Sequence, residues 1–132
     1  MDTSVSVLHI GNAGIADGIK ATYKYCGQDS EAETLYYANR IKDINEKFIC
    51  FEIEIENLNS EDVAISSINF TCSADGEEVV CCQRKGTDSL FLSQGQPETI
   101  RLYYEVYEDA KDIKLVLDGN EDTDADLTFC YE

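Results

Sequence analysis

The sequence predicts an all-β fold, an antiparallel β-sandwich of about seven to nine short strands. Apolar and polar residues alternate along most of the chain, which is the pattern of strands with one buried face. Turn residues separate the alternating stretches. The chain has 132 residues, a length that suits one domain and buries roughly two thirds of the unfolded surface. We therefore expect residues 1–132 to form a single domain.

Two strands are expected near the N-terminus. The stretches SVSVLHI, residues 4–10, and GIKATYKY, residues 18–25, both alternate, and a Gly-rich turn over residues 11–18 joins them. The second strand is expected to turn these residues to one face: Ile19, Ala21, Tyr23 and Tyr25.

Residues 48–57, FICFEIEIEN, form the clearest predicted strand. Residues 63–72 are expected to form the next one. Asp75-Gly76 then predicts a tight hairpin, because Gly tolerates the positive φ of such a turn, and residues 77–82 return as its partner. The strand at 48–57 should place four residues in the core and three in water: Ile49, Phe51, Ile53 and Ile55, then Glu52, Glu54 and Glu56.

Three further strands complete the predicted sandwich, at residues 98–107, 113–118 and 127–132. Strands at this spacing are typical of an immunoglobulin-like β-sandwich. The strand at 98–107 should place one set of residues inward and the alternate set outward: Ile100, Leu102, Tyr104 and Val106, then Arg101, Tyr103, Glu105 and Tyr107.

Residues 28–47 break the alternation. Ser30 and Glu33 have the spacing of a capping box, which predicts one short helix. A loop with a short extended piece fits the segment nearly as well. A helix here would carry a rough apolar stripe: Leu35, Tyr36, Ile41 and Ile44.

Residues 48–117 resemble a bacterial immunoglobulin-like (telokin-like) domain family of unknown function that is found in cell-surface lipoproteins. Two positions depart from the family's pattern: Pro97 follows the turn glycine, and Tyr107 stands where the family has proline. The resemblance implies an extracytoplasmic domain, the mature part of a processed precursor. It implies the fold, but it implies no catalytic or ligand-binding chemistry. The matching residues are Asn57, Phe70, Asp75, Gly76, Leu92, Gly95, Glu98, Tyr104, Glu105, Val106, Asp109, Ala110, Lys111 and Leu115.

The chain is strongly acidic. Ten Lys and Arg stand against 27 Asp and Glu, a net charge of −17. Such a charge repels nucleic acid and anionic lipid and attracts basic partners, so we expect no nucleic-acid partner. It also keeps a protein soluble. No apolar run is long enough to cross a membrane, and the N-terminus lacks the pattern of a signal peptide.

The six cysteines are spread along the chain without a C-x-x-C pair. A zinc site is therefore not expected, since zinc ligands usually come in close pairs. Several cysteines lie inside apolar strands, where Cys acts as a small buried hydrophobe, and one or two disulfides remain an open alternative. The six are Cys26, Cys50, Cys72, Cys81, Cys82 and Cys130.

The sequence offers little for catalysis. His9 is the one histidine, so both Ser/His/Asp and Cys/His schemes would depend on it, and we expect it to pack or to face solvent. The Gly-rich residues 11–18 lack the lysine of a P-loop. We expect a protein that is not an enzyme and needs no cofactor.

Two outward tyrosines, Tyr103 and Tyr107, are the candidate contact residues, because tyrosine is enriched at recognition surfaces. They either pack beneath residues 26–47, the favoured alternative, or form an exposed contact patch.

The acidic stretch at residues 118–126 is the candidate metal site. Its carboxylates follow the spacing of a calcium loop, but Thr123 stands where that loop needs Gly and Phe129 where it needs Glu. A hairpin loop between the last two strands is the favoured interpretation. The candidate calcium ligands are Asp118, Asn120, Asp122, Asp124 and Asp126.

Three functions remain open. The first is a non-enzymatic extracytoplasmic binding or structural module of a bacterial surface protein, whose partner is a protein or another cell-surface component. The second is a cytoplasmic acidic inhibitor that occupies a basic groove of a nuclease or toxin. The third is a weak calcium-binding module. The sequence leaves the ligand and the oligomeric state undetermined.

Overall fold

The computed structural model describes residues 6–16, 18–82, 89–117 and 127–132. Within these ranges the chain forms eleven strands, one α-helix and two short 3-10 helices. They are β1 (Ser6–Leu8), β2 (Ala13–Ala16), β3 (Ile19–Gly27), α1 (Ser30–Tyr36), η1 (Tyr37–Asn39), β4 (Glu46–Asn57), β5 (Val63–Ser66), η2 (Ser67–Asn69), β6 (Phe70–Ala74), β7 (Glu77–Val79), β8 (Ser89–Leu92), β9 (Glu98–Tyr107), β10 (Ile113–Leu117) and β11 (Leu127–Cys130).

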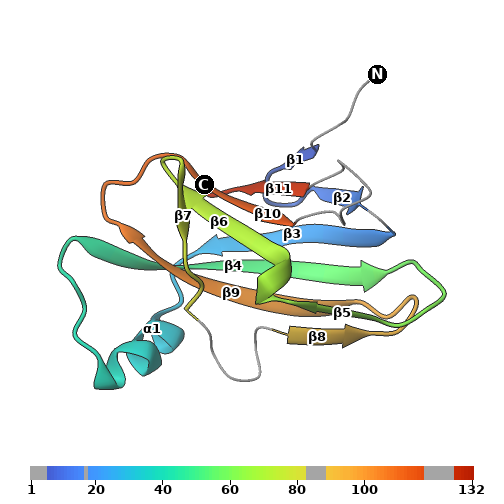
Figure 1. The fold of residues 1–132 in the computed structure, drawn as a ribbon, viewed down its shortest axis with the longest axis horizontal. Coiled ribbons are helices and arrows are strands. Elements are labelled where there is room, and N and C mark those ends of the chain that lie inside the picture. Colours follow the sequence, from blue (N-terminus) through green and yellow to red (C-terminus); the bar gives the residue numbers. More distant parts are fainter. Residues whose placement is uncertain (1–5, 17, 83–88, 118–126) are drawn as a thin grey trace.

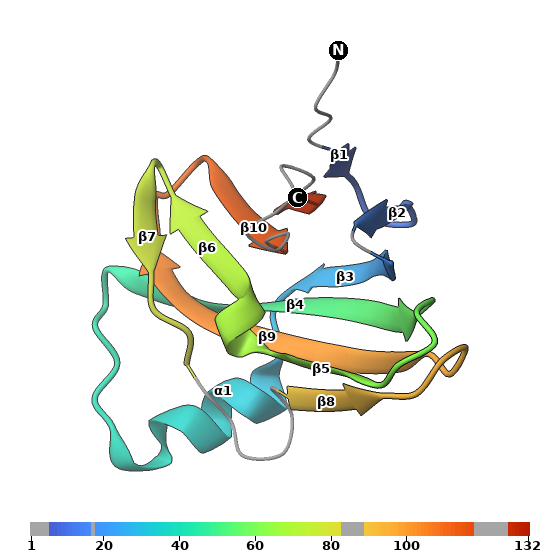
Figure 2. The same ribbon diagram turned by 45° about the vertical axis from the view of Figure 1, so that its right-hand side comes forward.

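The strands form the predicted β-sandwich, with two main sheets facing each other across the core (Figures 1 and 2). One sheet has the order β1-β11-β10-β6-β7, the other has the order β2-β3-β4-β9, and β5 and β8 form a two-stranded sheet beside β9. The pairing is antiparallel except between β1 and β11, which run parallel. The predicted sandwich is thus confirmed, although the described ranges contain eleven strands where about seven to nine were expected, and one of their pairs is parallel.

The core lies between the inner faces of the two sheets, and the predicted alternation of β4 and β9 is confirmed. Phe51 of β4 packs its ring against Tyr104 of β9, with ring centroids 6.1 Å apart. Phe129 of β11 meets Tyr23 of β3 edge to face across the sandwich, at 5.3 Å. The buried residues of β4 and β9 in this core are Ile49, Phe51, Ile53, Ile55, Ile100, Leu102, Tyr104 and Val106.

The N-terminal region corrects two expectations. The predicted turn at residues 11–18 contains a strand, β2, which pairs with β3. Within β3, the register with β4 shifts between Tyr23 and Tyr25. Such a bulge turns the following residues to the opposite face. Tyr25 is therefore exposed, where alternation placed it inward, and Cys26 is buried in its place.

The single strand predicted at residues 63–72 is wrong, because the chain changes sheets in its middle. β5 pairs with β8, η2 follows, and β6 pairs with β10 in the other sheet. A side-chain bond stabilises the bend: the amide oxygen of Asn69 accepts from the Ser66 N–H at 2.9 Å. Local alternation does not reveal the change, since both halves are extended.

The predicted hairpin at Asp75-Gly76 is confirmed. Both residues have positive φ, +51° and +88°, and they join β6 to β7. Strand β7 is shorter than the expected 77–82, because the chain leaves this sheet after Val79. Cys81 instead forms an isolated bridge with Tyr104 of β9.

The ambiguous segment contains a short helix, α1, whose position is close to the predicted capping box. The cap is Asp29, whose carboxylate accepts from the Ala32 N–H at 3.1 Å, and not Ser30. The expected apolar stripe is wrong, since Leu35, Ile41 and Ile44 are exposed. The outer face of the β4–β9 pair is aromatic, so the segment packs tyrosines onto it instead.

All six cysteines lie in the described part of the chain, and all are thiols without a disulfide. Four are buried, as expected of small hydrophobic side chains: Cys26, Cys50, Cys72 and Cys82.

Candidate functional site: an acidic hollow between β7 and β9

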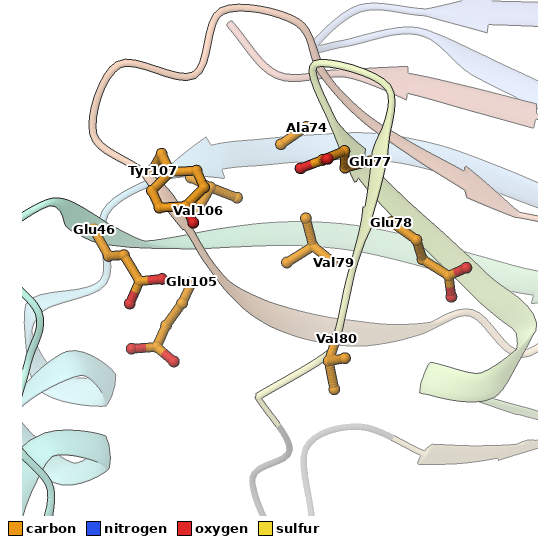
Figure 3. A pocket seen from close by; sticks show the side chains of 9 residues that line it. All are labelled: Glu46, Ala74, Glu77, Glu78, Val79, Val80, Glu105, Val106 and Tyr107. Atoms are coloured by element: carbon orange, nitrogen blue, oxygen red, sulfur yellow. The ribbon is translucent and has the colours of Figure 1, made fainter.

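A hollow of about 270 Å³ opens where the edge strand β7 faces the end of β9 and the start of β4 (Figure 3). Its walls combine carboxylates with apolar side chains. We refer to it as the acidic hollow, and its lining residues are Glu46, Ala74, Glu77, Glu78, Val79, Val80, Glu105, Val106 and Tyr107.

The strand pairings explain why these residues meet. Glu46 opens β4 and pairs with Tyr107, the last residue of β9, so the two lie side by side. The chain leaves β7 after Val79 and crosses toward β9, which leaves a gap between the sheets. Val79 lies half-buried in this gap, and Val80 beyond it is 84% exposed. The hollow therefore has an apolar floor and an exposed apolar lip.

Two of its carboxylates lie next to each other. Burial, repulsion from Glu105 and repulsion from Asp43 together raise the pKa of Glu46, while Lys42 lowers it in part. Figure 3 shows the side chains of Glu46 and Glu105 at the same end of the hollow. A cation bound between them would relieve this repulsion.

Glu105 is held in place from the side of α1. Its two carboxylate oxygens accept hydrogen bonds from the hydroxyls of Tyr37, at 2.5 Å, and Tyr36, at 3.4 Å. Burial, a hydrogen bond to Cys82 and the nearby negative charge of Glu105 raise the pKa of Tyr36 to about 12. Burial and the hydrogen bond to Glu105 also raise the pKa of Tyr37. Both tyrosines therefore stay protonated donors at neutral pH, and their bonds hold Glu105 beside the hollow.

No described cation neutralises these carboxylates through an ion pair. The ion pairs within the described ranges join Arg101 to Glu52, Lys114 to Asp112 and His9 to Glu132. None of them includes the four glutamates of the acidic hollow: Glu46, Glu77, Glu78 and Glu105.

The two candidate tyrosines have different positions. Tyr103 is 2% exposed and stacks on Phe48, and its hydroxyl donates to Asp29 at 3.0 Å. It packs beneath α1, as the favoured alternative had it, so it cannot contribute to an exposed patch. Tyr107 is 60% exposed and lines the acidic hollow. It also lines a neighbouring hollow of about 460 Å³ with Asn45, Glu108 and Asp109. Each alternative therefore holds for one residue: Tyr103 packs beneath the segment, Tyr107 stays exposed, and no exposed patch contains both.

The candidate calcium residues, Asp118, Asn120, Asp122, Asp124 and Asp126, lie outside the described residues. Among the residues that are described, no three His, Cys, Asp or Glu side chains are grouped closely enough to hold a metal ion. His9 is exposed, and its Nδ1 contacts the carboxylate of Glu132.

The glutamates of the acidic hollow had no distinguishing signal in the sequence. With 27 acidic residues in the chain, any window contains candidates. Glu46 and Glu105 come together only because β4 pairs with β9. Glu77 and Glu78 join them only because β7, in the other sheet, faces these two strands. Among the lining residues, only Tyr107 is a candidate contact residue on the sequence alone.

No protein-family model matches the chain, and no curated protein sequence matches it. Solved structures do share its fold. The predicted lipoprotein ycdA from Bacillus subtilis is 10% identical, with a TM-score of 0.68 over 91% of this chain and 38% of its own. An uncharacterised β-sandwich protein from Clostridium difficile is 12% identical, with a TM-score of 0.56 over 100% of this chain and 97% of its own.

The secreted protein MPT63 from Mycobacterium tuberculosis is 11% identical, with a TM-score of 0.62 over 99% of both chains. At these identities the likeness concerns the fold alone. The chain thus shares its β-sandwich fold with bacterial proteins that include a secreted one. No helix in the described ranges has the length and apolar character needed to span a bilayer.

Proposed function

We propose that this chain is a non-enzymatic, extracytoplasmic binding module of a bacterial surface protein, of the telokin-like immunoglobulin type, and that its acidic hollow binds a basic segment of a partner protein. The structural neighbours support the location, because one is a predicted lipoprotein and another a secreted protein. Proteinase treatment of protoplasts, which lack the cell wall but keep an intact membrane, tests this location. The module should be cleaved with the cell wall removed and the membrane intact, and protection under that condition would contradict it.

The observation that carries the binding role is the combination of charge and apolar surface in the hollow. A lysine or arginine side chain has an aliphatic stem and a cationic end. Its stem would lie on Val79 and Val80, and its cation would reach Glu46 and Glu105. The exposed ring of Tyr107 adds a face that attracts cations. A basic segment with aliphatic neighbours therefore fits the hollow.

Calorimetry with a short synthetic peptide tests the proposal. The probe is acetyl-Lys-Ile-Lys-Ile-Lys-amide, and acetyl-Glu-Ile-Glu-Ile-Glu-amide serves as its control. The wild-type chain should bind the basic peptide, and the double variant Glu77→Lys/Glu78→Lys should lose at least about tenfold in affinity. Both substituted residues are exposed, so the fold should persist.

A matched variant separates the hollow from net charge. Glu61→Lys/Asp62→Lys changes the charge by the same amount at the exposed turn before β5. It should keep the wild-type affinity within about threefold. Equal losses in both variants would show that only the overall charge of −17 attracts the peptide, which would contradict a specific site.

One observation favours the cytoplasmic acidic inhibitor as a second candidate. Six thiols without a disulfide suit a reducing compartment better than an oxidising one. Under this alternative the partner would be a nuclease or toxin with a basic groove. Affinity capture from cytosol at low salt, with this chain as the bait, should then retain one basic enzyme. The purified chain should inhibit the activity of that enzyme. Retention without inhibition would contradict the inhibitor.

A further inference from the structure

The segment between η1 and β4 exposes two large apolar side chains. Ile41 is 99% exposed and Ile44 is 87% exposed, three residues apart on a connection at the outer edge of the molecule (Figures 1 and 2). We call residues 40–45 the isoleucine tip. Single exposed apolar residues are common. Two neighbouring apolar side chains that are both almost fully exposed are more typical of a contact surface.

The tip is held in shape from within. The guanidinium of Arg40 donates to the Tyr36 carbonyl at 2.8 Å and lies over the Tyr36 ring at 4.1 Å. The ammonium of Lys42 donates to the Glu46 carbonyl. The Asp43 carboxylate accepts from the Asn45 N–H at 2.8 Å. These contacts fix the backbone at both ends of the tip while the two isoleucines project into solvent.

The charge of the tip differs from that of the rest of the chain. Two of its residues are cationic and one is acidic, within a chain of net charge −17. An apolar tip with two cations complements a hollow with an apolar floor and acidic walls. The acidic hollow has this character, and Glu46 belongs to its lining and directly follows the tip. Both surfaces thus lie side by side on one copy.

We propose that the chain forms a two-fold symmetric homodimer in which each copy places its isoleucine tip in the acidic hollow of the other. This proposal rests on the binding role proposed for the hollow and names its partner. Because the two surfaces are adjacent, a two-fold axis between them brings each tip to the opposite hollow at once. Ile41 then covers the exposed Val80, and Lys42 reaches Glu77 and Glu78.

A bilayer is the other surface that an exposed isoleucine pair could enter. The charge of the whole chain argues against it, since a net charge of −17 repels anionic lipid and the tip offers only two cations. The second copy is favoured because its complementary hollow is present on the chain itself.

Sedimentation equilibrium at about 150 mM salt, where long-range repulsion is screened, measures the assembly. Over roughly 10 μM to 1 mM protein, the wild-type mass should rise from 14.8 kDa to twice that value. The variant Ile41→Glu/Ile44→Glu should stay monomeric, and both positions are exposed, so its fold should persist. A wild-type mass of one chain throughout this range would overturn the proposal.

A charge exchange tests the contact itself. Glu77→Lys/Glu78→Lys places cations in the hollow, and Lys42→Glu places an anion in the tip. Two copies of the same variant bring like charges together at both contacts. Each variant alone should therefore dimerise at least about tenfold more weakly than the wild type. An equimolar mixture restores attraction at both contacts, so its affinity should return to within about threefold of the wild type. Failure of the mixture to recover would overturn the proposed contact.

Two further measurements separate this proposal from the binding role and from a membrane. The monomeric Ile41→Glu/Ile44→Glu variant keeps its hollow, so it should still bind the Lys-Ile-Lys-Ile-Lys peptide. If the wild-type protein dimerises but the monomeric variant does not bind the peptide, the binding role is contradicted and the proposed dimer contact is not. Wild-type protein that stays monomeric and cosediments with vesicles of phosphatidylcholine and phosphatidylglycerol would overturn the dimer in favour of membrane contact.

Discussion

The hydroxyl of Tyr23 donates a hydrogen bond of 2.7 Å to the backbone carbonyl of Cys130. This bond joins β3 to β11, and so it connects the two main sheets directly. The hydroxyl of Tyr104, on β9 in the same core, is buried and has no hydrogen-bond partner among the described residues. Burial raises the pKa of both tyrosines above their usual range. Two similar residues in one core therefore differ in a single polar contact.

This difference predicts opposite effects of the same substitution. Tyr23→Phe should reduce the free energy of unfolding by roughly 1–2 kcal/mol, because it leaves the Cys130 carbonyl without its donor. Tyr104→Phe should be neutral or stabilising by up to about 1 kcal/mol, since it removes a buried hydroxyl that makes no bond. Urea unfolding of both variants measures this, and a larger loss for Tyr104→Phe would contradict the assignment.

Asn57, one of the residues that carry the family resemblance, proves to be a buried polar hub. Its amide nitrogen donates to the carbonyls of Glu61 at 2.7 Å and Leu92 at 3.1 Å, and its amide oxygen accepts from the Asn59 N–H at 2.8 Å. It thus connects the end of β4 to the turn before β5 and to the end of β8.

Asn57→Asp should therefore destabilise the fold by roughly 2–4 kcal/mol at pH 7, since a buried carboxylate cannot donate. Burial raises the pKa of such a carboxyl in the folded state, and its protonated form regains one donor. The loss should therefore shrink at about pH 4 and grow as the pH rises. The exposed control Asn39→Asp should change stability by less than about 0.5 kcal/mol. A loss that is independent of pH would contradict this role.

Asp29 connects α1 to the sheet beneath it. One carboxylate oxygen caps the helix at the Ala32 N–H, and the other accepts from the Tyr103 hydroxyl. Asp29→Ala should cost roughly 1–3 kcal/mol of unfolding free energy, because both bonds are lost. Asp29→Asn keeps the capping oxygen and should cost less than half as much. Thermal unfolding followed by circular dichroism measures both, and equal losses would show that the cap itself contributes little.

The buried thiols predict a loss of stability in alkali. Burial raises the pKa of Cys50 and Cys72 to about 12 and that of Cys82 to about 11, from an ordinary value of 9.0. Because the folded-state pKa is raised, the stabilisation is complete below about pH 9 and is lost as the pH rises toward 11 and 12. Urea midpoints should fall over this window, and Cys72→Ala should show a shallower fall. A flat profile up to pH 11 would contradict the burial of these thiols.

Much of the fold could be predicted because its signals are local. The alternation of β4 and β9 and the Asp75-Gly76 turn depend on neighbouring residues, and all three are confirmed. The exposure of Tyr25 could not be predicted, since a bulge in β3 arises from pairing with β4. The change of sheet after β5 likewise depends on distant partners, β8 and β10.

The candidate site was largely hidden from the sequence for the same reason. Tyr107 could be singled out as an outward aromatic residue, but Tyr103 on the same face is covered by α1. Whether an outward residue meets solvent or a helix is a question of packing beyond the strand itself. The four glutamates of the acidic hollow become a site only when β7 faces the ends of β4 and β9.

The central claim is that the acidic hollow binds a basic, partly apolar segment, and chemical-shift mapping with the Lys-Ile-Lys-Ile-Lys peptide tests it most directly. The monomeric Ile41→Glu/Ile44→Glu variant is the suitable protein, because no second copy competes with the peptide for its hollow. The largest amide shifts should fall on Glu46, Val79, Val80, Glu105 and Tyr107. Shifts spread evenly over the acidic surface, or centred on the turn at Glu61 and Asp62, would contradict the claim.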